Sequence, residues 1–168
     1  MAHLEVNITK IEQQIIFGIF KSSNDKTISA DIKALSADYR SIILSKEITF
    51  PYFVLSRNYD TRSKDFLLFI GSDYEKDGLE RFVLPTGEYA KITIKPKLGF
   101  IWGAAIGEAK TYFYTKWLPK SPYQALNMEY EYHTERSTEK NPTIDIIFAI
   151  ERMTWSVNGE SHDDDTAA

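Results

Sequence analysis

The chain has 168 residues, of which 43% are hydrophobic and 14% aromatic, and its formal net charge is -4. This length and apolar content predict one compact soluble domain, and the acidic balance disfavours direct binding to nucleic acid. The sequence contains no Cys, which excludes disulfides, thiolate nucleophiles and cysteine metal sites.

The first half of the chain alternates between strand-like and helix-like patterns. Apolar residues alternate from Leu4 and run continuously over Ile15–Phe20, which predicts strand structure. Residues 27–44 place apolar side chains at steps of four and three, which predicts a helix with one buried face. Two strand-like runs follow at 52–60 and 63–74, and the polar stretch that joins them predicts a hairpin.

The second half repeats this order of elements. Residues 87–94, GEYAKITI, alternate as a strand, and a helix is predicted over 100–117 that stops at Pro119. The runs 127–135 and 143–151 predict a second hairpin. Matching helix to helix and hairpin to hairpin gives an offset of about 75 residues, which indicates an internal duplication.

We therefore expect an α+β fold made of duplicated strand-helix-strand-strand units with pseudo-two-fold symmetry, in which antiparallel sheets pack with two long helices. The halves, about 4–74 and 85–152, share one core and form a single domain over 1–155, since neither half alone covers its own sheet and helix. The segment 74–85 is the expected connector. The acidic tail 156–168 is predicted to be disordered.

One local sequence is specific enough to indicate a family. The segment KWLPKSPYQ at 116–124 is followed by an acidic and aromatic strand, MEYEYH, and then by TIDIIFAIE. With TGEYA before the second helix, this order resembles the GyrI-like family, which includes the effector-binding domains of AraC-type and MerR-type multidrug regulators. The resemblance covers about residues 3–152 and is strongest from Gly87 onward, although Pro122 stands where the family usually has Gly.

The resemblance implies a cavity at the junction of the halves, lined by aromatic residues and holding a buried Glu in the strand after the WLP element. On this chain the candidates are Glu129 and Glu131, which face the same side of a strand because they are two residues apart. Tyr130 and Tyr132 should point the other way and pack against the helices. The aromatic candidates for the cavity wall are Tyr52, Tyr59, Tyr89, Trp102 and Tyr112. A carboxylate among aromatic rings favours a cationic ligand.

Binding of an organic small molecule, a lipophilic or cationic drug or effector, is therefore the favoured function, with no cofactor. No helix-turn-helix pattern precedes Leu4, so we expect a stand-alone effector-binding protein. The sequence does not identify a protein partner. The resemblance also leaves open a hydrolase acting on reactive cyclopropane-bearing compounds, a gyrase-modulating protein and a porphyrin binder. The three His residues lack metal-ligand spacing, so no metal site is expected.

No segment approaches the roughly 20 apolar residues of a membrane-spanning helix. The start of the chain also lacks the basic and apolar pattern of a signal peptide. We therefore expect a cytoplasmic protein without a membrane partner.

Overall fold

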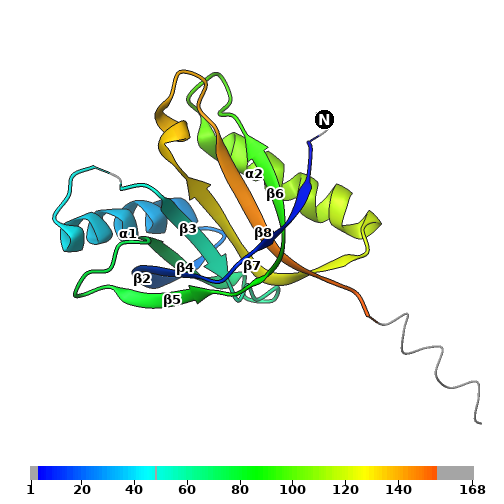
Figure 1. Ribbon diagram of the computed structural model, residues 1–168, viewed down its shortest axis with the longest axis horizontal. Helices are drawn as coiled ribbons and strands as arrows, with labels where there is room; N and C mark the ends of the chain where they lie inside the picture. Colours follow the sequence, from blue (N-terminus) through cyan, green and yellow to red (C-terminus); the bar gives the residue numbers. More distant parts are fainter. Residues whose placement is uncertain (1–3, 48, 155–168) are drawn as a thin grey trace, which may run out of the picture.

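The computed structural model describes residues 4–47 and 49–154. Over these residues the chain forms one antiparallel sheet of eight strands and two α-helices (Figure 1). The strands are β1 (Asn7–Ile11), β2 (Gln14–Asn24), β3 (Tyr52–Arg57), β4 (Asp65–Ser72), β5 (Glu80–Leu84), β6 (Gly87–Ile94), β7 (Tyr123–His133) and β8 (Ile144–Arg152). The predicted α+β class and antiparallel pairing are confirmed, but the strands form one curled sheet instead of separate sheets.

The helices lie close to their predicted positions. Helix α1 spans Ile28–Ile43, and α2 spans Trp102–Tyr112 and continues as a π-helical segment, η1, over Phe113–Trp117. Single turns of 3-10 helix follow at Leu118–Lys120 and Glu135–Thr138. The acidic tail expected at residues 156–168 lies outside the described residues. Within the described ranges, no helix has the length and hydropathy that crossing a membrane requires.

The strands follow the order β1-β6-β8-β7-β3-β4-β2-β5 across the sheet. Strands β3 and β7 therefore meet in the middle, and we call their pairing the seam. The elements β2, α1, β3 and β4 lie on one side of the seam, and β6, α2, β7 and β8 lie on the other. The strand β5 was not predicted: it lies in the expected connector and pairs with β2. Its sequence, ERFVL, is short and begins with two charged residues, so it carries little strand signal.

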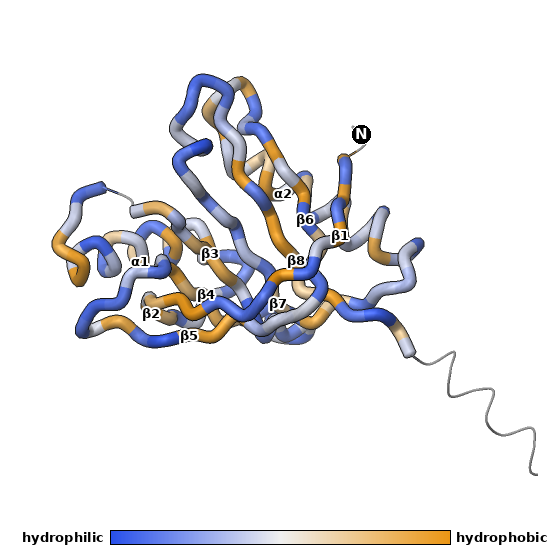
Figure 2. Tube along the Cα trace, viewed as in Figure 1, coloured by the Kyte–Doolittle hydropathy of each residue, from blue (hydrophilic) through white to orange (hydrophobic). Residues whose placement is uncertain are grey.

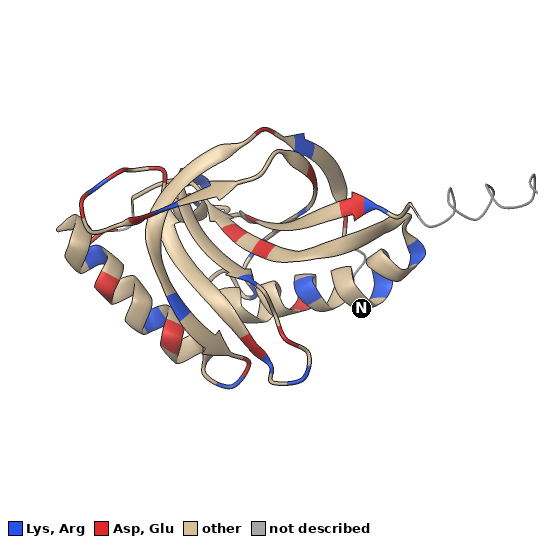
Figure 3. Ribbon diagram, turned by 90° about the horizontal axis from the view of Figure 1, so that it is seen from below, with Lys and Arg blue, Asp and Glu red and all other residues tan. Residues whose placement is uncertain are grey.

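Both helices pack on the same face of the sheet, as Figure 3 shows. Val54 of β3 pairs with Glu131 of β7, which pairs in turn with Ile146 of β8. Residues directly opposite each other in neighbouring strands point to the same face. Val54 packs in one apolar cluster with Leu35 of α1, and Ile146 packs in another with Ala109 of α2. The helices therefore flank the seam, and polar side chains of β7 lie between them.

The opposite face of the sheet carries a core that, among the described residues, is made by strand residues alone. Tyr130 and Tyr132 point to this face, with ring centroids 5.7 and 5.3 Å from that of Phe53. The expectation that these two tyrosines pack against the helices is therefore wrong, because both helices cover the face that carries the glutamates. Strand β8, buried from Ile144 to Ile150, serves the cores on both faces and is largely apolar in Figure 2.

A pair of glycines lets β2 and β4 approach closely. Gly18 pairs directly with Gly71, and a Cβ atom added to Gly71 would lie 2.2 Å from the carbonyl oxygen of Phe17. The ring of Phe69 covers both glycines, because its Cζ atom would lie 2.6 and 2.8 Å from the two added Cβ atoms. The absence of side chains at these two positions therefore makes room for an aromatic ring of the core.

The start of α1 is fixed by one carboxylate. Asp31 lies 2.8 Å from the ammonium group of Lys21 and accepts hydrogen bonds of 2.7 Å from the hydroxyl groups of Ser23 and Thr27. The Lys21 ammonium, followed by the hydroxyls of Thr27 and Ser23, lowers the pKa of Asp31 to about 2 from the ordinary value of 3.8.

A carboxyl group whose pKa is lower in the folded than in the unfolded protein stabilises the fold above its unfolded pKa. We expect this contribution to disappear as the pH falls from about 4 to 2, and the variant Asp31→Asn to lose less stability across that interval than the wild type. Urea unfolding at several pH values measures the difference. Parallel pH profiles for the two proteins would contradict the assigned role.

Candidate functional site

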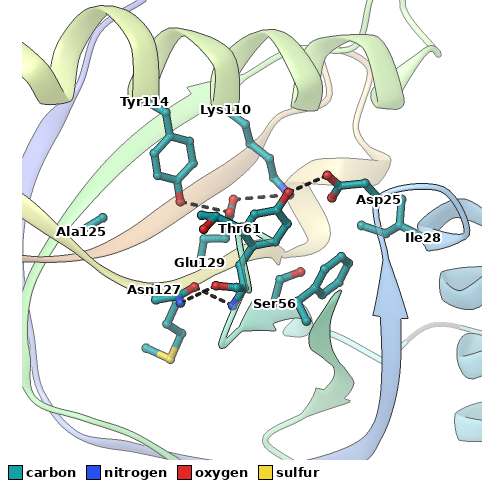
Figure 4. A pocket seen from close by; sticks show the side chains of 12 residues that line it. Asp25, Ile28, Ser56, Thr61, Lys110, Tyr114, Ala125, Asn127 and Glu129 are labelled. Atoms are coloured by element: carbon teal, nitrogen blue, oxygen red, sulfur yellow. Dashed lines mark hydrogen bonds and ion pairs between the residues drawn. The ribbon is translucent and has the colours of Figure 1, made fainter. Parts of the chain in front are cut away.

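A cavity of about 570 Å³ lies between the two helices, over the seam (Figure 4). Residues of both halves line it: α1 and the loop before it, β3 with the loop that follows, β4, the end of α2 with η1, and β7. The lining residues are Asp25, Ile28, Ser56, Tyr59, Thr61, Phe66, Lys110, Tyr114, Ala125, Asn127, Met128 and Glu129. The cavity thus combines apolar walls with a few charged groups, as small-molecule sites commonly do.

Glu129 is the central charged residue of the cavity. Its side chain is 17% exposed, and its Oε1 atom accepts a hydrogen bond of 3.1 Å from the hydroxyl group of Tyr114. The ammonium group of Lys110 lies 3.3 Å from Oε2. This ion pair lacks the alignment of a hydrogen bond, so the buried Oε2 atom has no hydrogen-bond donor among the described residues. Figure 4 shows Lys110 and Tyr114 reaching from the helix toward Glu129.

The hydroxyl group of Tyr114 stays protonated at neutral pH. Burial, together with the neighbouring Glu129 carboxylate, raises the pKa of Tyr114 well above its usual range. Tyr114 as a whole residue is 39% exposed, while its hydroxyl group points toward Glu129 (Figure 4). Tyr114 therefore acts as a fixed donor to Glu129 and leaves the other carboxylate oxygen for another cation or donor.

A break in β7 shapes the floor of the cavity. The register of β7 against β8 shifts between Ala125 and Glu129, and Asn127 adopts a positive φ of 57° there. The Asn127 side chain accepts a hydrogen bond of 2.8 Å from the Tyr59 backbone N–H and donates one of 3.0 Å to the Tyr59 carbonyl oxygen. An Asn tolerates this backbone conformation and uses its amide to hold the loop after β3.

Tyr59 lies on the other wall of the cavity, opposite α2. Its hydroxyl group donates a hydrogen bond of 2.6 Å to Asp25, which precedes α1. The hydrogen bond to Asp25 raises the pKa of Tyr59 above its ordinary value. The ring of Tyr59 stacks on Phe66 at a centroid distance of 6.2 Å and forms an aromatic wall of the cavity. Hydrogen bonds between the Tyr59 backbone and the Asn127 side chain, and from the Tyr59 hydroxyl group to Asp25, hold this ring in place.

The structure brings together two of the seven residues that the sequence analysis named for the site, Glu129 and Tyr59. Glu131 lies on the same face of β7, as its spacing from Glu129 predicts, but it pairs with His133 at 3.1 Å instead of lining the cavity. Tyr52 is buried beneath α1, where its hydroxyl group lies 2.9 Å from the Ser36 hydroxyl.

The other three named residues lie in or against the core. Tyr89 is on the face of the sheet opposite the helices, and its hydroxyl group donates to the Pro85 carbonyl oxygen at 2.6 Å. Trp102 and Tyr112 pack against the apolar cluster beneath α2. Within the described residues, no group of three or more His, Asp or Glu side chains could hold a metal ion.

Sequence reasoning missed Lys110 and Tyr114, which contribute the functional groups of the helix wall. They are four residues apart, so a helix continued to Trp117 places them on one face. The predicted cavity wall rested on aromatic residues and, for this helix, on its apolar stripe. The polar face next to that stripe, which carries a cation and a hydroxyl one turn apart, was the signal that could have found them.

The described residues thus form a curled antiparallel sheet with two helices on one face and a cavity between the helices. The model of the Cass2 family, described as integron-associated effector binding protein, matches residues 3–150. The chain therefore belongs to the Cass2 family. A search of curated proteins found no significant match.

Solved structures share the fold at low sequence identity. The integron cassette protein VCH_CASS2 of Vibrio cholerae has a TM-score of 0.63 at 17% identity, over 87% of this chain and 95% of that one. SAV2435, solved bound to tetraphenylphosphonium, has a TM-score of 0.64 at 9% identity, over 95% and 99%. EcmrR, solved in a DNA complex, has a TM-score of 0.64 at 15% identity, over 89% of this chain but 58% of that one. These likenesses show that the chain shares its fold with the three proteins.

Proposed function

We propose that this protein binds a lipophilic organic cation in the cavity over the seam, with Glu129 as its counter-charge. The observation that carries the proposal is the Oε2 atom of Glu129, a buried carboxylate oxygen that has the Lys110 ammonium group 3.3 Å away but no aligned hydrogen-bond donor among the described residues. Buried polar atoms are nearly always hydrogen-bonded in folded proteins, so an exception in a cavity is a candidate ligand contact. The formal charges that line the cavity, from Asp25, Lys110 and Glu129, sum to one negative charge, which a monovalent cation balances.

The walls of the cavity favour an apolar and aromatic ligand body. Ile28, Phe66, Ala125 and Met128 supply apolar surface, and Tyr59 supplies an aromatic ring. A volume of about 570 Å³ falls within the range for drug-sized ligands. A cation near a tyrosine ring gains about 0.5 to 2 kcal/mol, depending on its desolvation. The binding of tetraphenylphosphonium by SAV2435, a protein of the same fold, supports this choice of ligand class.

We further propose that the chain is a single domain built from two related units. Each unit has the order strand, helix, strand, strand, and each contributes three neighbouring strands in mirrored order on either side of the seam. Residues from both units line the cavity, so neither unit would keep the site if separated. This arrangement supports the duplication that the sequence pattern predicts.

A variant that fills the cavity tests the proposed function. Ala125 lines the cavity from β7, and Ala125→Trp should reduce the affinity for tetraphenylphosphonium at least about tenfold, because the indole occupies the ligand's volume. Isothermal titration calorimetry measures the affinity, and chromatography of the recovered ligand distinguishes binding from turnover.

Leu126→Trp is the matched control. It introduces the same side chain one position along the strand, at a residue that is 47% exposed and outside the lining, and it should bind as the wild type does. Equal affinities for the two variants and the wild type would show that the ligand binds elsewhere. A chemically altered ligand would establish an enzyme instead of a binding protein.

A further inference from the structure

Lys110 occupies the carboxylate that a cationic ligand would need. Its ammonium group lies 3.3 Å from Oε2 of Glu129, and that oxygen is closed to solvent. The side chain of Glu129 is 17% exposed and that of Lys110 is 28% exposed, so water screens the pair only in part. A second cation cannot approach the same oxygen without repulsion from this ammonium group.

The ion pair between Lys110 and Glu129 is also weakly constrained in its geometry. The geometry at Oε2 is not that of an aligned hydrogen bond, whereas Oε1 accepts a hydrogen bond from Tyr114. A lysine side chain has a flexible four-carbon stem and readily moves its ammonium group into water. Lys110 can therefore leave Glu129 while Tyr114 continues to orient the carboxylate.

We propose that Lys110 is a specificity-determining residue: its ammonium group holds Glu129 in the free protein, and a cationic ligand binds by displacing it. This inference rests on the proposed function. Displacement exchanges one ion pair for another, so breaking the Lys110 pair offsets part of the electrostatic gain that Glu129 gives to a cation. A small hydrophilic ammonium ion keeps only the remainder, while a bulky aromatic cation also gains from the apolar walls of the cavity. The lysine thus excludes ordinary cellular amines and selects lipophilic cations.

Titration of variants with a charged and an uncharged aromatic probe tests this inference. The probes are tetraphenylphosphonium and triphenylphosphine oxide. Lys110→Met keeps an unbranched side chain of similar length and removes its charge, so it should bind tetraphenylphosphonium about tenfold more tightly and the uncharged probe within about twofold of the wild type. Lys116→Met, an exposed position on the segment that continues the same helix, is the matched control and should leave both affinities unchanged.

A double-mutant cycle separates displacement from general repulsion. In the Glu129→Gln background the lysine has no carboxylate to hold, so Lys110→Met should improve tetraphenylphosphonium binding by about threefold or less. Equal gains in both backgrounds would overturn the inference, because they would show that Lys110 acts by charge alone. Lys110→Arg, which can pair with the carboxylate through two nitrogens, should weaken cation binding and gives a test in the opposite direction if the Met variant folds poorly.

The outcomes distinguish this inference from the proposed function. If the wild type binds tetraphenylphosphonium but Lys110→Met binds it no more tightly, only the role of Lys110 is overturned. If neither the wild type nor any variant binds either probe, the proposed function itself fails. Tighter binding of methylammonium than of tetraphenylphosphonium by the wild type would also contradict the selection that we infer.

Discussion

Glu129→Gln should lower the affinity for tetraphenylphosphonium about 30-fold, or about 2 kcal/mol, while the fold is preserved. The glutamine has the same shape and still accepts the hydrogen bond from Tyr114, but it lacks the charge that balances a cation in a partly buried site. An uncharged ligand of similar shape, triphenylphosphine oxide, should lose less than about threefold. Isothermal titration calorimetry with both probes gives the two ratios.

Glu131→Gln is the matched control for this experiment. The two glutamates lie on the same strand and the same face, but Glu131 pairs with His133 outside the cavity lining. We expect Glu131→Gln to change the affinity for either probe by less than about threefold. A larger loss for Glu131→Gln than for Glu129→Gln would show that Glu131, and not Glu129, is the carboxylate of the cation site. Equal losses for charged and uncharged probes would contradict charge-based binding.

Gly71→Ala should destabilise the protein by about 3 kcal/mol, an effect at the upper end for overpacking by one methyl group. The added Cβ atom would lie 2.2 Å from the Phe17 carbonyl oxygen and 2.8 Å from the Gly18 Cα atom, and both of these are backbone atoms. Neither can rotate away, so β2 and β4 must separate and Phe69 must leave its place over the glycine pair. Urea unfolding followed by circular dichroism measures the loss.

Gly87→Ala provides the comparison for this substitution. Gly87 is also a strand residue, but a Cβ atom added there would meet no atom of the described part of the chain within 4 Å. This variant should match the wild type within about 0.5 kcal/mol or be slightly more stable, because alanine restricts the unfolded chain. Equal stabilities for the Gly71 and Gly87 variants would show that the close approach of β2 and β4 does not require a glycine at position 71.

The fold was more predictable than the site because periodic patterns carry most of the information about secondary structure. The steps of four and three over residues 27–44 predicted α1, and the second predicted helix corresponds to α2 with η1. The alternation of β7 also placed Glu129 and Glu131 on one face. The sequence did not predict that the helices pack on the face that carries the glutamates, because alternation does not tell which side of a sheet the helices cover. Tyr130 and Tyr132 were assigned to the helices for that reason.

The cavity depends on features without a periodic signal. The register of β7 against β8 shifts around Asn127, and the Asn127 side chain holds Tyr59 by two hydrogen bonds, but a single Asn within a strand-like run looks like a surface residue in the sequence. Lys110 is likewise an ordinary helical lysine until the fold sets it beside Glu129. Such contacts join residues far apart in the chain, so spacing alone could not predict them.

The order of the sheet has a consequence for the behaviour of the protein at high concentration. In the described part of the chain, β1 and β5 stand at the two ends of the sheet, so each has an open row of backbone hydrogen-bonding groups. Open edges invite pairing with other molecules and aggregation. Both edges are only five residues long, β1 contains Lys10, and β5 begins with Glu80 and Arg81. Short charged edges of this kind resist intermolecular strand addition, which helps to keep an incompletely closed sheet monodisperse in a crowded solution.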